Sequence, residues 1–527
     1  MLLIAAPRRW TLFTALSLVV LVLAALAAPA QAGARSSIQP SRVVLERVSA
    51  TAPQVRVDGT TTTFTYSVTM PLRTTLRGLQ LRVRPTDGPE AGKDVGKDIG
   101  RRTDLTFRGT RTWSATHTGL EGSWTAAVAW SLDGVTWSTG PPTSFTTRAA
   151  TPKTLFGTLQ SSTERLASTT AAGVDLATFA VAWDRFEPVE GQVNTGYVAE
   201  LRTSLAQYRA AGRQVVLDAG VHYPPSWLFA YPNSRYVDQY GDAYAHPEPG
   251  KKIANMVFNQ QMRDKQARYL GQLLGALGTD FYGLRLGGGW YGELNYPDHV
   301  YAGRSNAYWG FDAVARGAAP GLATGLRPNP VPGWQPGTPT ADHDAARRFA
   351  DWYLASLDDY HDWQITTARK LFAGNLLMMY PSWGMRPGQL EAAVSGDLAG
   401  GTSAEINGEV QRGFDVARFI GGITDPKVVV YTTWLNADAS ADAGSDPRYW
   451  SPVKHLAGLA AAGRAQPLTV MGENTGRDSL AGLQLTFAQA RRYGLQAVVW
   501  AFEPDLYQGG YATIDDLAAA IRAHRAG

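Results

Sequence analysis

Two glutamates stand where paired carboxylates could do acid–base chemistry. Glu293 lies in a stretch rich in glycine and aromatic residues, Gly287–Pro297 (GGGWYGELNYP), and Glu473 lies in Val470–Gly476 (VMGENTG). Such a pair can cleave a glycosidic bond, because one carboxylic acid protonates the departing oxygen while the other carboxylate attacks the anomeric carbon or activates water. Glutamate fills both roles when its surroundings push the two pKa values apart. The alternative for either residue is a cap on a helix or an ion pair with an arginine.

The elements that must position these glutamates follow an α/β pattern. After residue 152, short apolar strands alternate with amphipathic helical stretches, which favours a parallel sheet. Helices are expected at Val198–Ala211, Asn259–Leu277, Ala345–Phe372 and Thr486–Tyr493. The eight expected strands are Leu155–Leu159, Leu176–Val181, Val215–Ala219, Gly283–Gly287, Leu376–Tyr380, Val428–Thr432, Leu468–Gly472 and Ala497–Ala501.

Eight such units over residues 152–527 predict an α/β fold of the (β/α)8 TIM-barrel type with long loops. A doubly wound sheet is disfavoured, since no glycine-rich dinucleotide fingerprint follows the first strand. A TIM barrel carries its catalytic residues at the C-terminal ends of the strands. Glu293 comes just after the fourth expected strand and Glu473 at the end of the seventh, so we expect both at one rim. The stretch from Trp290 to Thr340 predicts a long loop on the same face.

Three motifs resemble segments of known enzymes. They are Trp183–Gly191 (WDRFEPVEG), His222–Leu228 (HYPPSWL), and a helical stretch containing Arg347–Tyr353 and Ser356–Tyr360. In this order they are similar to the segments after the second, third and fourth strands of clan A glycoside hydrolases, in particular of the family 42 β-galactosidases. The resemblance spans residues 155–505 through short motifs. It implies that Glu293 is the acid/base, that Glu473 is the nucleophile, and that the anomeric configuration is retained.

One position departs from the clan A pattern. Clan A enzymes usually carry Asn-Glu after strand four, whereas this chain has Gly292-Glu293. The local sequence GELNYP instead resembles the GELRYP segment of β-amylases, in which the glutamate is the general acid and a second glutamate near strand seven activates water with inversion. The GGNVGD loop of β-amylases is absent here. Three hypotheses stay open: a retaining glycosidase, an inverting enzyme of β-amylase type, and a carbohydrate-binding barrel without catalysis.

Further candidates for substrate binding lie near the expected strand ends, where packing of the barrel top is the competing role for each. The resemblance implies that Tyr431 contacts the nucleophile. For Glu187 and Glu190, helix capping is the favoured interpretation. Arg285 could form an ion pair with a catalytic glutamate. The binding candidates are Trp183, His222, Trp227, Trp290, Tyr291, Asn295, Trp383, Tyr431, Trp434, Asn474, Trp500 and Glu503.

Metal and cofactor chemistry finds little support in the residues. The chain has no cysteine, which excludes a thiolate nucleophile, an iron–sulfur cluster and a Cys-based zinc site. No HExxH motif occurs, and Asp218 and His222 would make a metal site with few ligands. We therefore expect no cofactor and no catalytic metal.

The composition bears on the partners. The 49 basic and 45 acidic residues leave a net charge of only +4, which gives no electrostatic case for nucleic acid or an anionic membrane. The 16 tryptophans suit stacking on sugar rings, with core packing as the alternative for each. A carbohydrate substrate is the expected partner, and the oligomeric state stays open.

The N-terminal region has two parts of its own. Arg8 and Arg9, the apolar run Leu12–Leu26 and Ala30-Gln31-Ala32 predict a signal peptide over residues 1–32, cleaved after Ala32, and hence a secreted protein. Residues 40–150 predict an all-β sandwich of immunoglobulin or fibronectin type, which serves as a spacer or packing module. The linker is expected at Thr146–Pro152. The strands are expected at Thr61–Val68, Leu79–Val83, Trp113–Thr118, Trp124–Ser131 and Val135–Thr139.

Overall fold

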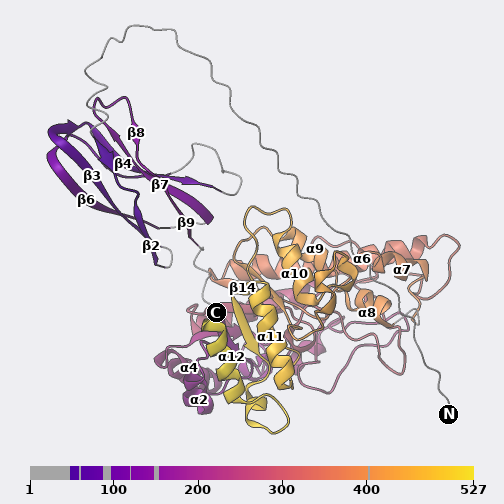
Figure 1. Cartoon of the computed structure of the whole chain (residues 1–527). Coiled ribbons are helices and arrows are strands. Elements are labelled where there is room, and N and C mark those ends of the chain that lie inside the picture. The colour runs from indigo at the N-terminus through magenta and orange to yellow at the C-terminus, as the bar shows by residue number, and fades with distance from the viewer. Residues whose placement is uncertain are drawn as a thin grey trace, which may run out of the picture. The chain divides into compact units, whose positions relative to one another are not determined.

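The computed structural model describes residues 48–58, 61–86, 97–118, 120, 122–147, 154–400 and 404–526. Residue contacts divide the chain into two units, Met1–Ala150 and Thr151–Gly527, drawn in indigo to purple and in magenta to yellow (Figure 1). The expected signal peptide, residues 1–32, and most of the expected linker lie outside the described residues.

The first unit contains two antiparallel sheets. Alternate side chains of one long strand, Phe64, Tyr66, Val68 and Met70, are buried in a cluster that also holds side chains of the other sheet, such as Leu81. This period of two is the mark of a sheet with one buried face. The first sheet has β1 (Ser49–Ala50), β3 (Thr61–Leu76), β2 (Gln54–Asp58) and β6 (Leu105–Thr118), and the second has β5 (Lys97–Arg102), β4 (Gly78–Pro85), β7 (Gly122–Ser131), β8 (Ser138–Thr139) and β9 (Thr143–Thr147).

The expected strand at Val135–Thr139 is largely wrong. Only Ser138 and Thr139 pair with β7, and the residues before them form a turn. The Asp133 carboxylate accepts hydrogen bonds from the backbone amides of Val135 and Thr136 at 2.8 and 2.7 Å. These bonds compete with strand pairing and leave the Val135 side chain 84% exposed.

The second unit is a closed barrel of eight parallel strands, which confirms the predicted TIM barrel. Neighbours in the chain are neighbours in the barrel, and the last strand pairs with the first through Leu155–Thr158 and Ala497–Trp500. Each strand lies within two residues of its predicted bounds. The strands are β10 (Leu155–Thr158), β11 (Leu176–Ala180), β12 (Gln214–Asp218), β13 (Gly283–Leu286), β14 (Asn375–Tyr380), β15 (Val428–Thr432), β16 (Val470–Glu473) and β17 (Ala497–Trp500).

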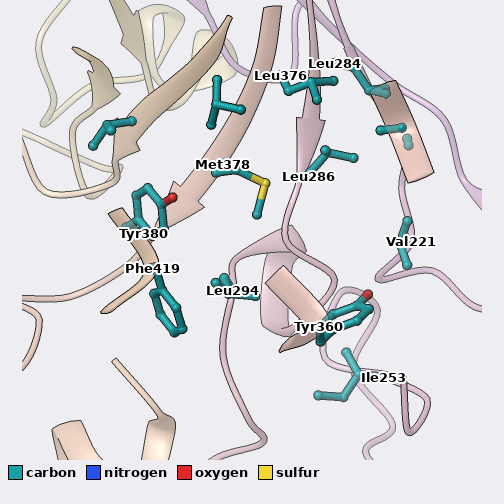
Figure 2. Close-up of a cluster of buried hydrophobic side chains, with 14 of the residues drawn as sticks. Val221, Ile253, Leu284, Leu286, Leu294, Tyr360, Leu376, Met378, Tyr380 and Phe419 are labelled. Carbon is teal, nitrogen blue, oxygen red and sulfur yellow. The ribbon is translucent and has the colours of Figure 1, made fainter. Parts of the chain in front are cut away.

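Strand alternation separates two layers of side chains. Outward residues such as Leu284, Leu286 and Met378 pack with helix residues including Phe419 (Figure 2). Inward residues form a smaller cluster inside the barrel. Its members include Leu176, Val216, Leu377, Val429, Met471 and Ala497.

The helices follow the strands in the expected order. The four predicted helices are present as α4 (Thr195–Ala210), α5 (Gln260–Leu277), α6 (Asp344–Arg369) and α11 (Leu480–Arg492), the last of which starts six residues before its predicted bound at Thr486. Residues 293–343, all of them described, contain no helix and no strand beyond isolated bridges, as predicted for a long loop after β13. The others are α2 (Leu166–Ala171), α3 (Trp183–Phe186), α7 (Gln389–Ser395), α8 (Ala404–Arg412), α9 (Val416–Gly422), α10 (Pro452–Ala461) and α12 (Ile514–Ala526).

Short 3-10 turns complete the second unit. They are η1 (Thr163–Arg165), η2 (Ser226–Ala230), η3 (Trp290–Gly292), η4 (Ser440–Ala443), η5 (Pro447–Tyr449) and η6 (Glu503–Tyr507). Across the described residues, no helix combines the length and the apolar character that crossing a membrane requires.

Glu187 and Glu190 tie the loop after β11 to α5, and Glu187 is also the C-cap residue of α3. The fully buried Glu187 carboxylate accepts hydrogen bonds from Arg268 at 2.5 Å, from the Gly191 amide at 2.6 Å and from the Trp183 indole at 3.1 Å. Glu190 pairs with Lys265 and with Arg268. The expected capping role thus holds for the Glu187 backbone, while both carboxylates form ion pairs across two elements.

The Glu187→Ala substitution is expected to lower the free energy of unfolding by about 3–5 kcal/mol, because it removes the buried carboxylate that accepts hydrogen bonds from Arg268, the Gly191 amide and the Trp183 indole. Denaturant unfolding of the two proteins measures the difference. The matched control is Glu200→Ala, whose exposed pair with Arg185 is worth under about 1 kcal/mol. Equal effects at the two positions would contradict the role given to Glu187.

Candidate active site

Glu473 ends β16 and points into the barrel mouth. Its side chain is buried, and its Oε2 atom accepts a hydrogen bond from the Tyr431 hydroxyl at 2.6 Å and one from Arg285 at 3.5 Å. Burial raises the pKa of this carboxyl, and the Arg285 charge and the Tyr431 hydroxyl oppose that rise. The carboxylate is therefore held in place by a hydroxyl from the neighbouring strand β15 and by a cation from β13 across the barrel.

Arg285 lies between two carboxylates. Its guanidinium pairs with Asp218 of β12 at 3.1 Å on one side and with Glu473 of β16 at 3.5 Å on the other. Its Nε–H donates to the Met379 sulfur at 3.1 Å. Asp218 and Glu473 are the last residues of their strands, two residues beyond Val216 and Met471 of the inward cluster. The Asp218 carboxylate thus already has a cation partner, which argues against a metal shared with His222.

Glu293 follows η3 and lies close enough to Glu473 to respond to its charge. Burial and, to a smaller extent, the Glu473 carboxylate raise the pKa of Glu293 to about 7, against the lowering effect of the Arg412 guanidinium. The Asn295 amide donates to Glu293 Oε2 at 3.3 Å. A carboxyl with this pKa is half protonated near neutral pH, as a general acid/base requires.

The glycine before Glu293 has a steric reason. Gly292 has φ +84°, and a Cβ atom there would lie 2.9 Å from His222 Nδ1. An asparagine in this place would therefore be strained and would collide with the imidazole. Asn295, two residues after Glu293, supplies a side-chain amide to the carboxylate instead. His222 is buried, which lowers its pKa to about 4 and leaves the ring neutral.

Four predicted binding residues lie on the loops that carry or adjoin the two glutamates. Trp290 is partly buried, donates from its indole to the Tyr244 hydroxyl at 2.5 Å, and has Arg412 4.9 Å from its ring centre. Tyr291 is 47% exposed and donates to Glu248. Trp434 is half-buried after β15. Asn295 is the fourth.

Trp227 and Trp383 are also only partly buried. The Trp227 indole donates to the Glu187 carbonyl at 2.9 Å and packs edge-on against Trp183. Arg386 lies 5.9 Å from the ring centre of Trp383. No described contact joins either tryptophan to Glu293 or Glu473.

Four other predicted binding residues have structural roles. Trp183 and Trp500 are at most 1% exposed and pack in the layer between barrel and helices. The Asn474 side-chain amide donates to the Ala501 carbonyl at 2.9 Å and accepts from the Ala501 amide at 2.7 Å. The Glu503 carboxylate accepts hydrogen bonds from Thr158 and from the Ser162 amide. All four side chains are buried, so the structure does not support their predicted role.

Two residues near Glu293 were not predicted from the sequence. Arg412, at the end of α8, lowers the pKa of Glu293 and lies over the Trp290 ring, while the Thr433 hydroxyl also lowers that pKa. Thr433 directly follows β15, a position that could have signalled it. Arg412 lies on a helix far along the chain, and no local pattern marks it.

One group of side chains has a spacing that could hold a cation. Ligand atoms of Asp358, His361 and Asp362 on α6 lie within 4.8 Å of one another. The buried His361 ring already contacts the Asp362 carboxylate and the Tyr380 hydroxyl, each at 2.9 Å. We interpret the group as a hydrogen-bond network that joins α6 to β14.

Comparisons with known proteins bear on the fold and on the class of enzyme. Residues 157–279 match the model of glycoside hydrolase family 42, described as β-galactosidase. This match covers the second and third strands with two of the resembling motifs. The comparisons support a clan A glycosidase. None of the curated proteins compared with the chain matches it significantly.

Three solved structures are similar to the barrel domain, and the first of them shows the same fold. The catalytic domain of β-amylase from Paenibacillus polymyxa is 17% identical, with a TM-score of 0.52, and the match covers 71% of this chain and 98% of that one. The β-galactosidase from Halorubrum lacusprofundi is 14% identical (TM-score 0.45, 70% and 58% covered), and that from Bacillus circulans sp. alkalophilus is 11% identical (TM-score 0.46, 71% and 56% covered). The chain thus spans somewhat more than half the length of these galactosidase chains.

Proposed function

We propose that the protein hydrolyses O-glycosidic bonds of an oligo- or polysaccharide with retention of configuration, Glu293 being the acid/base and Glu473 the nucleophile. The observation that carries this proposal is the difference between the two carboxyls. Glu293 is partly buried and has a pKa of about 7, while Glu473 is buried and held by Arg285 and Tyr431. Groups with unequal environments can share the work of acid and nucleophile.

In the first step the protonated Glu293 gives its proton to the glycosidic oxygen, and the leaving group departs as an alcohol. The Glu473 carboxylate attacks the anomeric carbon and forms a glycosyl ester. In the second step the ionised Glu293 takes a proton from water, which attacks the anomeric carbon and releases Glu473 as a carboxylate. The Glu473 charge raises the pKa of Glu293, so its loss in the ester lowers that pKa and favours the base role.

An inverting mechanism of β-amylase type is the second candidate, favoured by the Gly292-Glu293-Leu294 segment. In that case Glu473 activates water, and the two carboxyl groups lie about 6.5–9.5 Å apart instead of about 5–5.5 Å. Proton NMR of the first-formed anomer decides between the two. The retaining proposal predicts the configuration of the substrate, and the opposite anomer would contradict it while leaving hydrolysis by the same pair intact.

The Tyr431→Phe substitution is expected to lower kcat/KM at least about tenfold, because a hydrogen bond to a charged group is worth about 1.5–3 kcal/mol. The lost hydroxyl lowers the pKa of Glu473 in the wild type, so the acid limb of the pH profile should move to higher pH. A pH series of kcat/KM measures both effects. An unchanged acid limb would show that the hydroxyl does not support the carboxylate.

For the remainder of the chain, we propose that residues 1–32 form a signal peptide cleaved after Ala32 and that the mature protein is secreted. N-terminal sequencing of the protein from the culture medium of an expressing host tests this.

We further propose that residues 40–150 fold as a sandwich of immunoglobulin or fibronectin type that acts as a spacer for the barrel domain, residues 152–527. Two antiparallel sheets that share one buried cluster support this fold.

A further inference from the structure

A pocket of about 660 Å3 lies in the loops that follow β11 and β12, and its lining contains neither Glu293 nor Glu473. The size falls in the range of small-molecule sites. Apolar and aromatic surface forms much of the wall, through several prolines and through Phe229, Tyr244 and His246. Such walls suit the C–H faces of a sugar ring. The charged lining residues are Asp184, Arg235 and Lys252.

The pocket shares a wall with the loop of Glu293. The Trp290 indole donates to the hydroxyl of the lining residue Tyr244 at 2.5 Å, and the Tyr291 amide donates to the Gly250 carbonyl at 2.7 Å. Trp290 is also held by its backbone amide, which donates to Asn295 at 3.0 Å. The segment from Tyr244 to Ile253 therefore separates the pocket from the acid/base, and a glycan bound at one can extend to the other.

Both cations of the pocket lack an ion-pair partner among the described residues, although the Lys252 charge lowers the pKa of the Asp184 carboxyl against the rise that burial causes. Arg235 donates to the Tyr244 carbonyl at 3.1 Å and stacks over the Phe229 ring at 4.3 Å. Among the described residues, no carboxylate lies within 4.0 Å of Arg235 or of the exposed Lys252. The neighbouring Lys251 differs, since it pairs with Glu248 at 2.8 Å.

Asp184 leaves the pocket with an excess of positive charge. It is the single carboxylate of the lining, and it forms no ion pair with Lys252 among the described contacts. The Arg235 guanidinium presents planar donors that match a carboxylate or a sulfate, and the ammonium of Lys252 adds a second charge. The Nδ1 atom of His246 accepts from the Glu248 amide at 3.1 Å, so its other ring nitrogen remains as a further donor.

We propose that this pocket binds an acidic sugar residue, bearing a carboxylate or a sulfate ester, of the glycan that the neighbouring glutamates cleave. The inference rests on the proposed function and adds the substrate class. The apolar wall contacts the ring of the sugar, and Arg235 and Lys252 bind its anionic group. Neutral substrates lack that anionic contact and bind more weakly.

Calorimetric titration of the Glu473→Gln protein, which binds without turnover, tests the pocket. The probes are the trimers of galacturonate, glucuronate and mannuronate, each compared with its uncharged methyl ester, together with a sulfated oligosaccharide and its desulfated form. We expect at least one charged probe to bind tenfold or more tightly than its neutral counterpart. Preference for the sulfated probe would assign the anion as sulfate, and preference for a uronate trimer would assign it as carboxylate.

Two variants locate the binding. In the Glu473→Gln background, Lys252→Gln and Arg235→Gln should each weaken binding of the charged probe about tenfold and leave binding of the neutral probe unchanged. Lys252 is exposed, so its variant keeps the test valid if Arg235→Gln does not fold. Arg185→Gln is the matched control, because Arg185 adjoins Asp184 in sequence but pairs with Glu200. Equal binding of charged and neutral probes, or unchanged binding in Lys252→Gln, would overturn the proposal. Residual hydrolysis by Glu473→Gln would count against the catalytic proposal alone.

Discussion

The Glu473→Gln substitution is expected to lower kcat at least about 10^4-fold, the size of effect seen when a residue that makes the covalent bond is removed. The amide cannot attack the anomeric carbon, and it cannot act as a base in the inverting alternative. The fold should survive, because Arg285 keeps its pair with Asp218 at 3.1 Å. Turnover of an activated aryl glycoside and thermal unfolding of both proteins measure the two effects.

Glu503→Gln is the matched control for this loss. Glu503 is a buried glutamate after the next strand, and its carboxylate contacts Thr158 and the Ser162 amide. Its replacement should affect stability and leave kcat largely unchanged.

Azide adds a further test of the two roles. With Glu473→Ala, azide should yield a glycosyl azide of opposite configuration to the substrate. With Glu293→Ala, it should yield a glycosyl azide of the same configuration as the substrate. If Glu473→Gln kept more than a few per cent of wild-type kcat, the role of Glu473 would be wrong.

The second large effect concerns Glu293 and pH. The reactive form of Glu293 in the first step is the acid, and burial raises its pKa to about 7. The rate should therefore be lost as the pH rises through about 7. The reactive form of Glu473 is the carboxylate, and burial raises its pKa above the ordinary value of 4.5. Activity should thus be lost as the pH falls, and this limb should lie above pH 4.5. The pH dependence of kcat/KM reports both groups in the free enzyme.

Glu293→Gln should remove the alkaline limb and slow the cleavage of poor leaving groups by about 10^2–10^4-fold. Aryl glycosides with an acidic phenol need little protonation, so their first step should change much less. The ratio of the two substrates' rates, measured in wild type and variant, separates acid catalysis from binding. An alkaline limb that persists in Glu293→Gln would assign it to another group.

The barrel was predictable because its strands are short apolar runs bounded by turn residues. β15, with the sequence VVVYT, lies at Val428–Thr432 as predicted. The positions of Glu293 and Glu473 followed from the rule that barrels carry their sites at the strand ends. The departure at Gly292 was visible in the sequence, but its cause was not, since the imidazole of His222 belongs to a different loop.

The aromatic binding residues were harder to predict, because direction matters as much as position. Glu473 pairs in register with Val499, which shares its inward direction, so the next residue, Trp500, must point outward into the helix layer. The alternation of side chains along the strand determines the direction of Trp500, but that direction could be assigned only once the strand register was known. Arg412 could not be found at all, since its approach to Trp290 depends on how α8 folds over the barrel mouth.

The most direct test of the central claim is release of reducing sugar from a broad panel of polysaccharides and aryl glycosides, neutral and acidic, by the wild-type and Glu473→Gln proteins side by side. We predict release by the wild type on at least one member and no release by the variant. Equal release by both would contradict the assignment of the carboxylates. Binding without release by either protein, on every member of the panel, would identify a carbohydrate-binding barrel and contradict the catalytic account.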